Sequence, residues 1–428
     1  MSTILTEYNE AAAVALALEM MPPLKTVGDV WREYRAGAWR EIDYHRFRPA
    51  VLSIMDNKIV SNRRCLEILK HIESAKQVLE SDFRSFYMLD DDAVLVNAKN
   101  GIVRVEPDYK VELLPHAPDR DFTRQLDAVY DLQTPCPNFE RVLKEALPDG
   151  EDRALLQLFA GSLLYPSCKF EAALVCYGPG GTGKSTIAES VVSILGTELV
   201  ERIGMSNICD PKGYFLPKLK HVAVNLGTEL DALEVGESGN FKALVSGENI
   251  AVRPIYGAPF TMMTTAKLWF LSNSLPRFKH GTDAEQRRTR FLRFDKVPAA
   301  KDVDLKTKLI AERDGIFLWA LEGLSRLLSL KEMPLGGAES KAVHDRFSIS
   351  NDPLGAFIAS HCRIDSQGHA IKAHFKTALV EFYEANAIPC ENDAWIFKQL
   401  WDRYPQVKES QLRQGETRTR VIKGVILL

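Results

Sequence analysis

A glycine-rich stretch between a short apolar run and a helical pattern constrains this chain more than any other feature. Residues 176–186 read Cys-Tyr-Gly-Pro-Gly-Gly-Thr-Gly-Lys-Ser-Thr and fit the pattern G-x-x-x-x-G-K-[ST]. The preceding run, residues 172–176, is short enough for a buried strand, and apolar residues recur at helical spacing over 187–194 before Gly196. The sequence therefore predicts a strand, a phosphate-binding loop and a helix, in the order found in nucleoside triphosphatases.

The chemistry of phosphate binding explains the residue types in this loop. Glycines let backbone N–H groups curl around phosphate oxygens, and the start of a helix adds partial positive charge. Lys184 is expected to reach the β- and γ-phosphates, and the Ser185 hydroxyl is expected to ligate Mg²⁺. With ATP and Mg²⁺ as expected cofactors, the predicted binding residues are Gly178, Pro179, Gly180, Gly181, Thr182, Gly183, Lys184, Ser185 and Thr186.

Two later apolar runs predict further strands, and each is followed by a candidate catalytic residue. Residues 222–226 precede Glu229, which is expected to ligate Mg²⁺ through water or to act as the base toward the attacking water. Residues 267–272 precede Asn273, which is expected to contact the γ-phosphate as a sensor. Ligands of open α/β sheets bind at the carboxyl ends of the strands, where both residues should lie. A surface glutamate and a turn asparagine are the alternatives.

An arginine cluster, Gln286-Arg287-Arg288-Thr289-Arg290, stands before a fourth predicted strand at residues 291–294. Such a cluster can be a solvated run of charge. In a nucleoside triphosphatase it can also supply arginine fingers, which complete the site of a neighbouring subunit and stabilise transition-state charge. Arg287 and Arg288 are therefore predicted catalytic residues.

Composition sets wider bounds. A length of 428 residues suggests two to four domains, and the net charge of −3 does not exclude a locally basic surface for nucleic acid. The seven cysteines are scattered without a C-x-x-C pair, which favours a reducing compartment over a zinc site or disulfides. The N-terminal segment lacks the features of a signal peptide, so we expect a cytoplasmic protein without a membrane span.

The segments on either side of the nucleotide-binding region have their own patterns. Residues 93–105 predict a hairpin around Asn100-Gly101, and residues 30–40 predict two short strands around Gly37. Helices are expected over 68–79, over 139–146 with Asn138 as the cap, and over 155–164.

The last part of the chain, residues 351–428, has the pattern of a winged helix. Helices are expected from Asp352, within 371–387 and over 392–401, the candidate recognition helix, before a hairpin over 407–428. Basic residues outnumber acidic ones toward the C-terminus, which suits contact with duplex phosphates. The alternative is an interaction module that binds no DNA.

Taken together, these segments resemble the superfamily 3 helicases, in the branch of phage, plasmid and poxvirus primase–helicases. The likeness covers most of the chain. Besides the phosphate-binding loop, it rests on three motifs in matching order, which are Phe241-Lys242-Ala243-Leu244-Val245-Ser246-Gly247-Glu248, Leu271-Ser272-Asn273-Ser274-Leu275-Pro276 and the pair Arg287-Arg288. Three earlier segments resemble the N-terminal domain that precedes such ATPases, and these are Asn100-Gly101, Thr123-Arg124-Gln125-Leu126 and Cys136-Pro137-Asn138-Phe139.

The resemblance implies an α/β fold class, with an AAA+-like P-loop ATPase core at 151–330. An α+β N-terminal adapter domain at 1–150 and a C-terminal winged-helix domain at 351–428 would flank it. It further implies a homo-hexameric ring that moves 3′-to-5′ on single-stranded DNA. A hairpin at about 249–260 would enter the central channel, with DNA contacts from Lys242, Arg253 and Tyr256. Its tip lacks the lysine often found in the family, so an ordinary hairpin remains an alternative. Physically, an arginine beside an aromatic ring suits single strands.

The sequence thus favours an ATP-dependent replicative helicase of a phage, phage satellite or plasmid in a bacterial host cell. The main rival is an origin-binding initiator whose ATPase controls assembly, and both roles can coexist. A further alternative is an ATP-driven machine for another polymer. Expected partners are single-stranded and forked DNA and origin duplex DNA. No acidic primase pattern is found, so a separate primase or host replication proteins are further expected partners.

Overall fold

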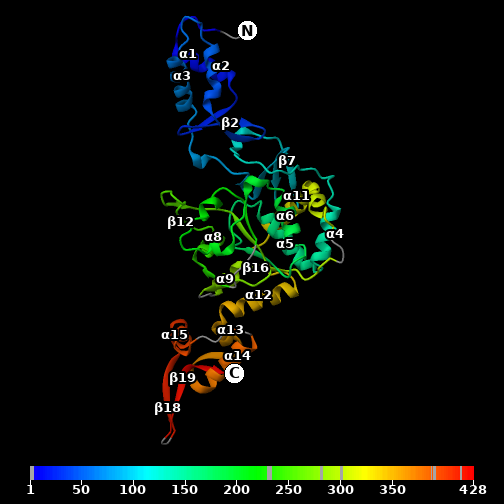
Figure 1. Ribbon diagram of the computed structural model, residues 1–428, viewed down its shortest axis with the longest axis vertical. Coiled ribbons are helices and arrows are strands. Elements are labelled where there is room, and N and C mark those ends of the chain that lie inside the picture. Colours follow the sequence, from blue (N-terminus) through cyan, green and yellow to red (C-terminus); the bar gives the residue numbers. More distant parts are fainter. Residues whose placement is uncertain are drawn as a thin grey trace.

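The structure is a computed structural model, and it describes residues 4–228, 234–279, 283–298, 302–386, 388, 392–414 and 417–428. Figure 1 shows an elongated molecule in which an N-terminal body, a central α/β body and a C-terminal body follow one another along the long axis. The chain therefore passes from one end of the molecule to the other.

The N-terminal body packs three helices beside a small antiparallel sheet in the order β1-β2-β3. Its own apolar core contains Trp31, Val51 and Ile68, each at most 1% exposed. The hairpin predicted around Gly37 is confirmed, because β2 pairs with β3 there. The elements are α1 (Glu10–Met20), β1 (Leu24–Val27), β2 (Val30–Arg35), β3 (Ala38–Ile42), α2 (Arg48–Ser53) and α3 (Asn62–Ala75).

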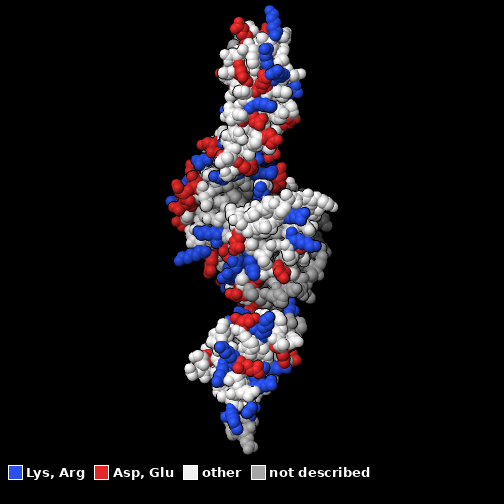
Figure 2. Space-filling view, turned by 90° about the vertical axis from the view of Figure 1, so that its left-hand side faces the viewer, with Lys and Arg blue, Asp and Glu red and all other residues white. Residues whose placement is uncertain are grey.

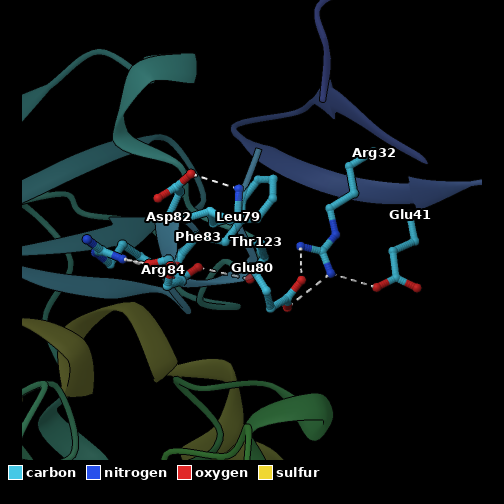
Figure 3. Close-up of polar contacts among 9 residues, drawn as sticks. Arg32, Glu41, Leu79, Glu80, Asp82, Phe83, Arg84 and Thr123 are labelled. Carbon is cyan, nitrogen blue, oxygen red and sulfur yellow. Dashed lines mark hydrogen bonds and ion pairs between the residues drawn. The ribbon is translucent and has the colours of Figure 1, made fainter. Parts of the chain in front are cut away.

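A polar junction connects this body to the rest of the chain (Figure 3). Arg32 of β2 donates to Glu41 at 3.0 Å and to Glu80 at 3.3 Å, and its guanidinium lies 4.5 Å from the centre of the Phe83 ring. The segment that follows is tied in turn to the neighbouring loop, since Thr123 donates to the Arg84 carbonyl. Main-chain contacts add to this junction, since the Trp39 N–H donates to the Phe122 carbonyl at 2.7 Å, while the N-terminal body keeps an apolar core of its own.

A four-stranded antiparallel sheet, β4-β5-β6-β7, comes next. Its residues Val94, Val96 and Val103 share one apolar core with the helices of the central body, so the sheet is part of that body's packing. The hairpin predicted around Asn100-Gly101 is confirmed, because β5 pairs with β6 and Ala98 lies opposite Gly101. The strands are β4 (Tyr87–Asp90), β5 (Ala93–Ala98), β6 (Gly101–Val105) and β7 (Val111–Leu114).

A parallel sheet forms the centre of the molecule, and its described strands run in the order β16-β8-β14-β10-β9. Side chains alternate between its two faces. Leu174 and Cys176 of β8 face the core built with α5, α6 and α11, whereas Ala173 and Val175 face the core built with α8 and α12. The strands are β8 (Ala173–Tyr177), β9 (Val200–Glu201), β10 (Val224–Thr228), β14 (Lys267–Ser272) and β16 (Thr289–Arg293).

Helices and short pairs of strands surround this sheet (Figure 1). The helices are α4 (Pro137–Ala146), α5 (Gly150–Ser162), α6 (Lys184–Val192), α7 (Met205–Ile208), α8 (Gly239–Ser246), α9 (Asp283–Arg288), α10 (Leu305–Ala311), α11 (Arg313–Leu328) and α12 (Ala338–Asn351). The short strands are β11 (Glu234–Glu237), which pairs with β15 (Arg277–Lys279), and β12 (Ile250–Val252), which pairs with β13 (Phe260–Met262).

The C-terminal body contains α13 (Pro353–His361), β17 (Cys362–Ile371), α14 (Lys372–Ala385), α15 (Asp393–Arg403), β18 (Lys408–Gln414) and β19 (Thr417–Leu427). Its sheet has the order β17-β19-β18, and its core contains Phe357, Phe375 and Leu400. Figure 1 places the β18–β19 hairpin at the lower tip of the molecule, and Figure 2 shows lysine and arginine side chains there.

Two sequence predictions differ from the structure at helix ends. The helix expected over 68–79 is α3, which begins at Asn62 after the Ser61 side chain accepts from the Arg64 N–H. The cap expected at Asn138 is wrong, because the helix already begins at Pro137. Asn138 instead donates its side-chain amide to Glu312, so a tertiary contact uses the polar group that the sequence assigned to capping.

Candidate functional site

A cavity of about 1290 Å³ lies at the carboxyl edge of the parallel sheet. Its floor is the loop and first turn of α6, residues 180–186, and its lining includes Thr228 at the end of β10 and Asn273 directly after β14. In open α/β sheets this edge is where ligands bind. The predicted loop and the predicted sensor residue are therefore brought together at one cavity, as their strands require.

The glycines of the loop have two different roles. Gly183 adopts φ +86 directly before α6, a left-handed conformation that favours glycine, and a Cβ there would meet nothing within 4 Å. Gly178 instead lies against the main chain, where a Cβ would come within 1.9 Å of the Phe294 carbonyl oxygen. Its N–H donates to the Ser272 carbonyl at 3.1 Å. Gly178 thus joins neighbouring strands rather than presenting its N–H to the cavity.

Lys184 is held inside the loop. Its ammonium donates to the carbonyls of Gly178 at 2.6 Å and Pro179 at 2.7 Å, and to the side-chain oxygen of Asn273 at 3.2 Å. Burial lowers the pKa of the Lys184 ammonium, because a charged group loses its hydration there. The ammonium therefore lies among acceptors that an anionic ligand could replace.

One wall of the cavity comes from a helix that the sequence reasoning did not assign to the site. Helix α4 lines it with Arg141, Val142 and Lys144, and Lys296 and Val297 line it after β16. Three cationic side chains thus stand near the phosphate-binding loop, together with the carboxylates of Asp302 and of Glu145, which pairs with Arg141 at 2.9 Å. No motif indicated them, because α4 follows a proline-rich connector and meets the loop only through tertiary packing.

The predicted metal ligands are only partly placed. Ser185 lines the cavity at the start of α6, the position expected of a hydroxyl that ligates Mg²⁺. Glu229 lies outside the described residues, directly after Thr228, which ends β10 at the cavity. Within the described parts of the chain, no group of three or more His, Cys, Asp or Glu side chains could hold a metal ion.

The three arginines near β16 differ in their surroundings. Arg287 is exposed at the end of α9. Arg288 is 9% exposed, donates to the Ser246 hydroxyl at 2.9 Å and pairs with Glu171 at 3.1 Å. Arg290 is 7% exposed and donates to the carbonyl of Met333 at 2.8 Å. Arg288 and Arg290 are therefore engaged in contacts within the chain, whereas Arg287 is exposed to solvent.

The predicted DNA-binding residues belong to α8 and to the hairpin that follows it, and none of them lines the cavity. Lys242 pairs with the carboxylate of Glu285 at 3.3 Å and is 36% exposed. Arg253 and Tyr256 belong to the hairpin between β12 and β13, which Figure 1 shows projecting from the core. Tyr256 is fully exposed and adopts φ +63, so its ring stands free at the tip. Lys242 thus pairs with a buried residue of α9, whereas the exposed Arg253 donates within its own hairpin, to the Gly257 carbonyl at 3.4 Å.

Residues 25–148 match a family model described as D5 N terminal like, and residues 176–288 match a model described as a family of unknown function, DUF5906. No curated protein matches the chain.

Two apo structures of the NrS-1 C-terminal region are similar over the whole chain. One has a TM-score of 0.57 at 12% identity and covers 98% of this chain and 100% of that one. The other, an A form, has a TM-score of 0.54 at 11% identity and covers 97% and 100%. At such identity the likeness shows a shared fold.

The D5-like match lies in the N-terminal part of the chain, and the likeness in fold extends from there to the C-terminus. Each family model covers less than half of the chain. A separate observation concerns membranes, since among the described helices none combines the length and apolar character that a bilayer span needs.

Proposed function

We propose that this chain is an ATP-driven DNA helicase of the superfamily 3 type that serves the replication of a phage, phage satellite or plasmid. The observation that carries the proposal is the cavity at the sheet edge, where Lys184 of the glycine-rich loop meets Asn273 at 3.2 Å. Both residues belong to motifs that resemble this family. The proposal includes an AAA+-like ATPase core at 151–330, an adapter domain at 1–150 and a winged-helix domain at 351–428.

In this proposal the loop at 178–186 binds the phosphates of ATP. Lys184 exchanges its present carbonyl acceptors for β- and γ-phosphate oxygens, and Asn273 contacts the γ-phosphate or the attacking water. Ser185 would hold Mg²⁺, which when bound neutralises phosphate charge. Glu229 would orient the water or accept its proton. The basic side chains of Arg141, Lys144 and Lys296 outnumber the carboxylates of Glu145 and Asp302 in the lining and would add positive potential there.

The chain is further proposed to act as a hexameric ring moving 3′-to-5′ on single-stranded DNA. Arg287 would complete the site of the neighbouring subunit, because it is exposed whereas Arg288 and Arg290 are buried and bonded within the chain. The hairpin carrying Arg253 and Tyr256 would contact the strand, since arginine binds phosphate and an exposed ring can stack on a base.

A strand-displacement assay tests this function. Forks with a 3′ tail or a 5′ tail are incubated with the full chain, with and without ATP, and Lys184→Ala serves as the inactive control. ATP-dependent displacement that requires the 3′ tail is the expected result. A protein whose ATPase is not stimulated by single-stranded DNA would contradict the proposal and favour a machine for another polymer.

A second function, origin recognition, is favoured by the β18–β19 hairpin. Arg413 lies directly opposite Arg418 across the two strands, and Arg420 follows on the same face. Basic side chains on one face of a hairpin can contact duplex phosphates, which carry the opposite charge. Selection from a pool of random duplexes with the full chain tests the role. Enrichment of one sequence that is lost in Arg418→Gln/Arg420→Gln would support an initiator, and no enrichment would leave the helicase alone.

A further inference from the structure

Helix α9 is fixed to helix α8 at both ends of α8. Near the start of α8, the carboxylate of Glu285 accepts a hydrogen bond from the hydroxyl of Ser238 and pairs with the ammonium of Lys242 at 3.3 Å. At the last residue of α8, the Ser246 hydroxyl accepts from the guanidinium of Arg288 at 2.9 Å. Glu285 and Arg288 of α9 therefore contact α8 near its start and at its end.

This connection links an exposed arginine on α9 to the hairpin that follows α8. Arg287 lies between Glu285 and Arg288 in the sequence and is exposed, because α9 turns the intervening position outward. Beyond Ser246, the chain turns through Gly247 at φ +69 and enters the hairpin of β12 and β13. A displacement of α9 must move α8, and α8 leads directly into that hairpin.

Stability alone gives no reason for a charged connection here. Glu285 is fully buried, whereas Lys242 keeps 36% of its side chain exposed. A buried carboxylate loses its hydration, and a well-packed apolar pair of similar volume is often at least as stable as a buried ion pair. Charged partners do, however, fix direction and register more strictly than apolar contacts do, since their geometry is specific.

We propose that Glu285 is a positioning residue that joins α9 and α8 into one unit and so couples the exposed Arg287 to the β12–β13 hairpin. Through this unit, the nucleotide state that Arg287 senses in the neighbouring subunit changes the position of Arg253 and Tyr256. Lys242 then acts through its pair with Glu285 rather than by contacting DNA. This inference rests on the proposed function, because it needs both a nucleotide and a strand of DNA.

The measurement that tests it is the change of DNA affinity with nucleotide state. Fluorescence anisotropy of a labelled oligothymidylate is recorded with the full chain, first without nucleotide and then with a non-hydrolysable ATP analogue. The ratio of the two dissociation constants is the coupling, and allosteric couplings commonly reach about 5–150-fold. In Glu285→Gln, which keeps the volume and removes the charge, we expect this ratio to fall toward one. The affinity without nucleotide should stay within about twofold.

Two further variants keep the result interpretable. Glu67→Gln is the matched control, because it removes an exposed carboxylate paired with Arg63 and should leave the ratio unchanged. Ser246→Ala breaks the other connection, at the end of α8, with a smaller change than the loss of a buried carboxylate. It should lower the ratio even if Glu285→Gln does not fold.

The outcomes separate this inference from the proposed function. A folded Glu285→Gln protein that retains the wild-type ratio would overturn the inference, as would an unchanged ratio in Ser246→Ala. Wild-type protein that binds both ligands without any coupling would also overturn it while leaving a DNA-binding ATPase intact. Wild-type protein that binds neither the analogue nor the oligonucleotide would instead refute the proposed function itself.

Discussion

Replacing Arg287 and Arg288 of α9 one at a time should have opposite effects on stability and on ATP turnover. Arg288→Ala removes a charged hydrogen bond to Ser246 and a pair with Glu171 at a site that is 9% exposed. Hydrogen bonds to charged groups contribute about 1.5–3 kcal/mol. Because the side chain of Glu171 is 47% exposed and can regain water, we take about 2 kcal/mol for the loss.

This free energy corresponds to a fall in Tm of about 4–8 °C, since a domain of this size loses about 2–4 °C for each kcal/mol. Arg287→Ala, at an exposed position, should change the free energy of unfolding by no more than about 0.5 kcal/mol. If Arg287 is the finger, however, its loss should lower ATP turnover by about 10³–10⁵. Arg288→Ala should therefore mainly lower the Tm, whereas Arg287→Ala should mainly lower ATP turnover.

The assay pairs thermal melting with ATPase rates, and then mixes Arg287→Ala subunits with Lys184→Ala subunits. A site that takes Lys184 from one chain and Arg287 from the next can be rebuilt in mixed rings, so partial recovery of turnover is expected. Arg288→Ala should keep measurable turnover at temperatures below its lowered Tm. The reasoning is refuted if Arg288→Ala melts like the wild type but has no turnover while Arg287→Ala remains active.

Three other predictions concern the cavity. Gly178→Ala should lower the free energy of unfolding by about 2–3 kcal/mol, because the added Cβ would overlap the Phe294 carbonyl. Gly180→Ala is the control and should melt like the wild type, because a Cβ at that position would have no neighbour within 4 Å. Equal melting temperatures of the two variants would contradict this prediction. Since burial lowers the pKa of Lys184, the affinity for ADP should begin to fall at a pH below the ordinary pKa of 10.5, and an affinity that stays constant up to pH 10.5 would exclude the effect. In the same pH range the contribution of Lys184 to the free energy of unfolding should rise with pH, because the unfolded chain binds more protons than the folded one. Glu229→Gln should retain ATP binding and trap protein on DNA with little hydrolysis, and full turnover measured in this variant would assign the role to another acidic residue.

Local patterns predicted the parts of the site that depend on neighbouring residues in the sequence. The loop before α6, the strand β14 with Asn273 at its end, and the hairpin around Asn100-Gly101 all appear where the motifs put them. Each depends on glycine conformations, alternation or turn chemistry within a few positions. A short window of sequence therefore contains enough information for them.

Contacts between distant segments could not be predicted in this way. Glu285 meets Ser238 across 47 positions, and no pattern indicates that its carboxylate is buried. Arg288 looked equivalent to Arg287 in sequence, and only the packing of α9 separates them. Gly178 was expected to serve the phosphates, yet its lack of a Cβ serves the approach of Phe294. Such differences arise from tertiary packing, which the residue types alone leave open.

The position of α4 has a consequence for how this protein can be divided or recombined. The predicted boundary at residue 150 falls between α4, which ends at Ala146, and α5, which begins at Gly150. A fragment starting at that boundary keeps the phosphate-binding loop but loses the cavity wall formed by Arg141 and Lys144. It also exposes apolar surface that Phe139 now covers within the shared core. The smallest unit that evolution or an experimenter can transplant with its chemistry intact must therefore begin before Pro137.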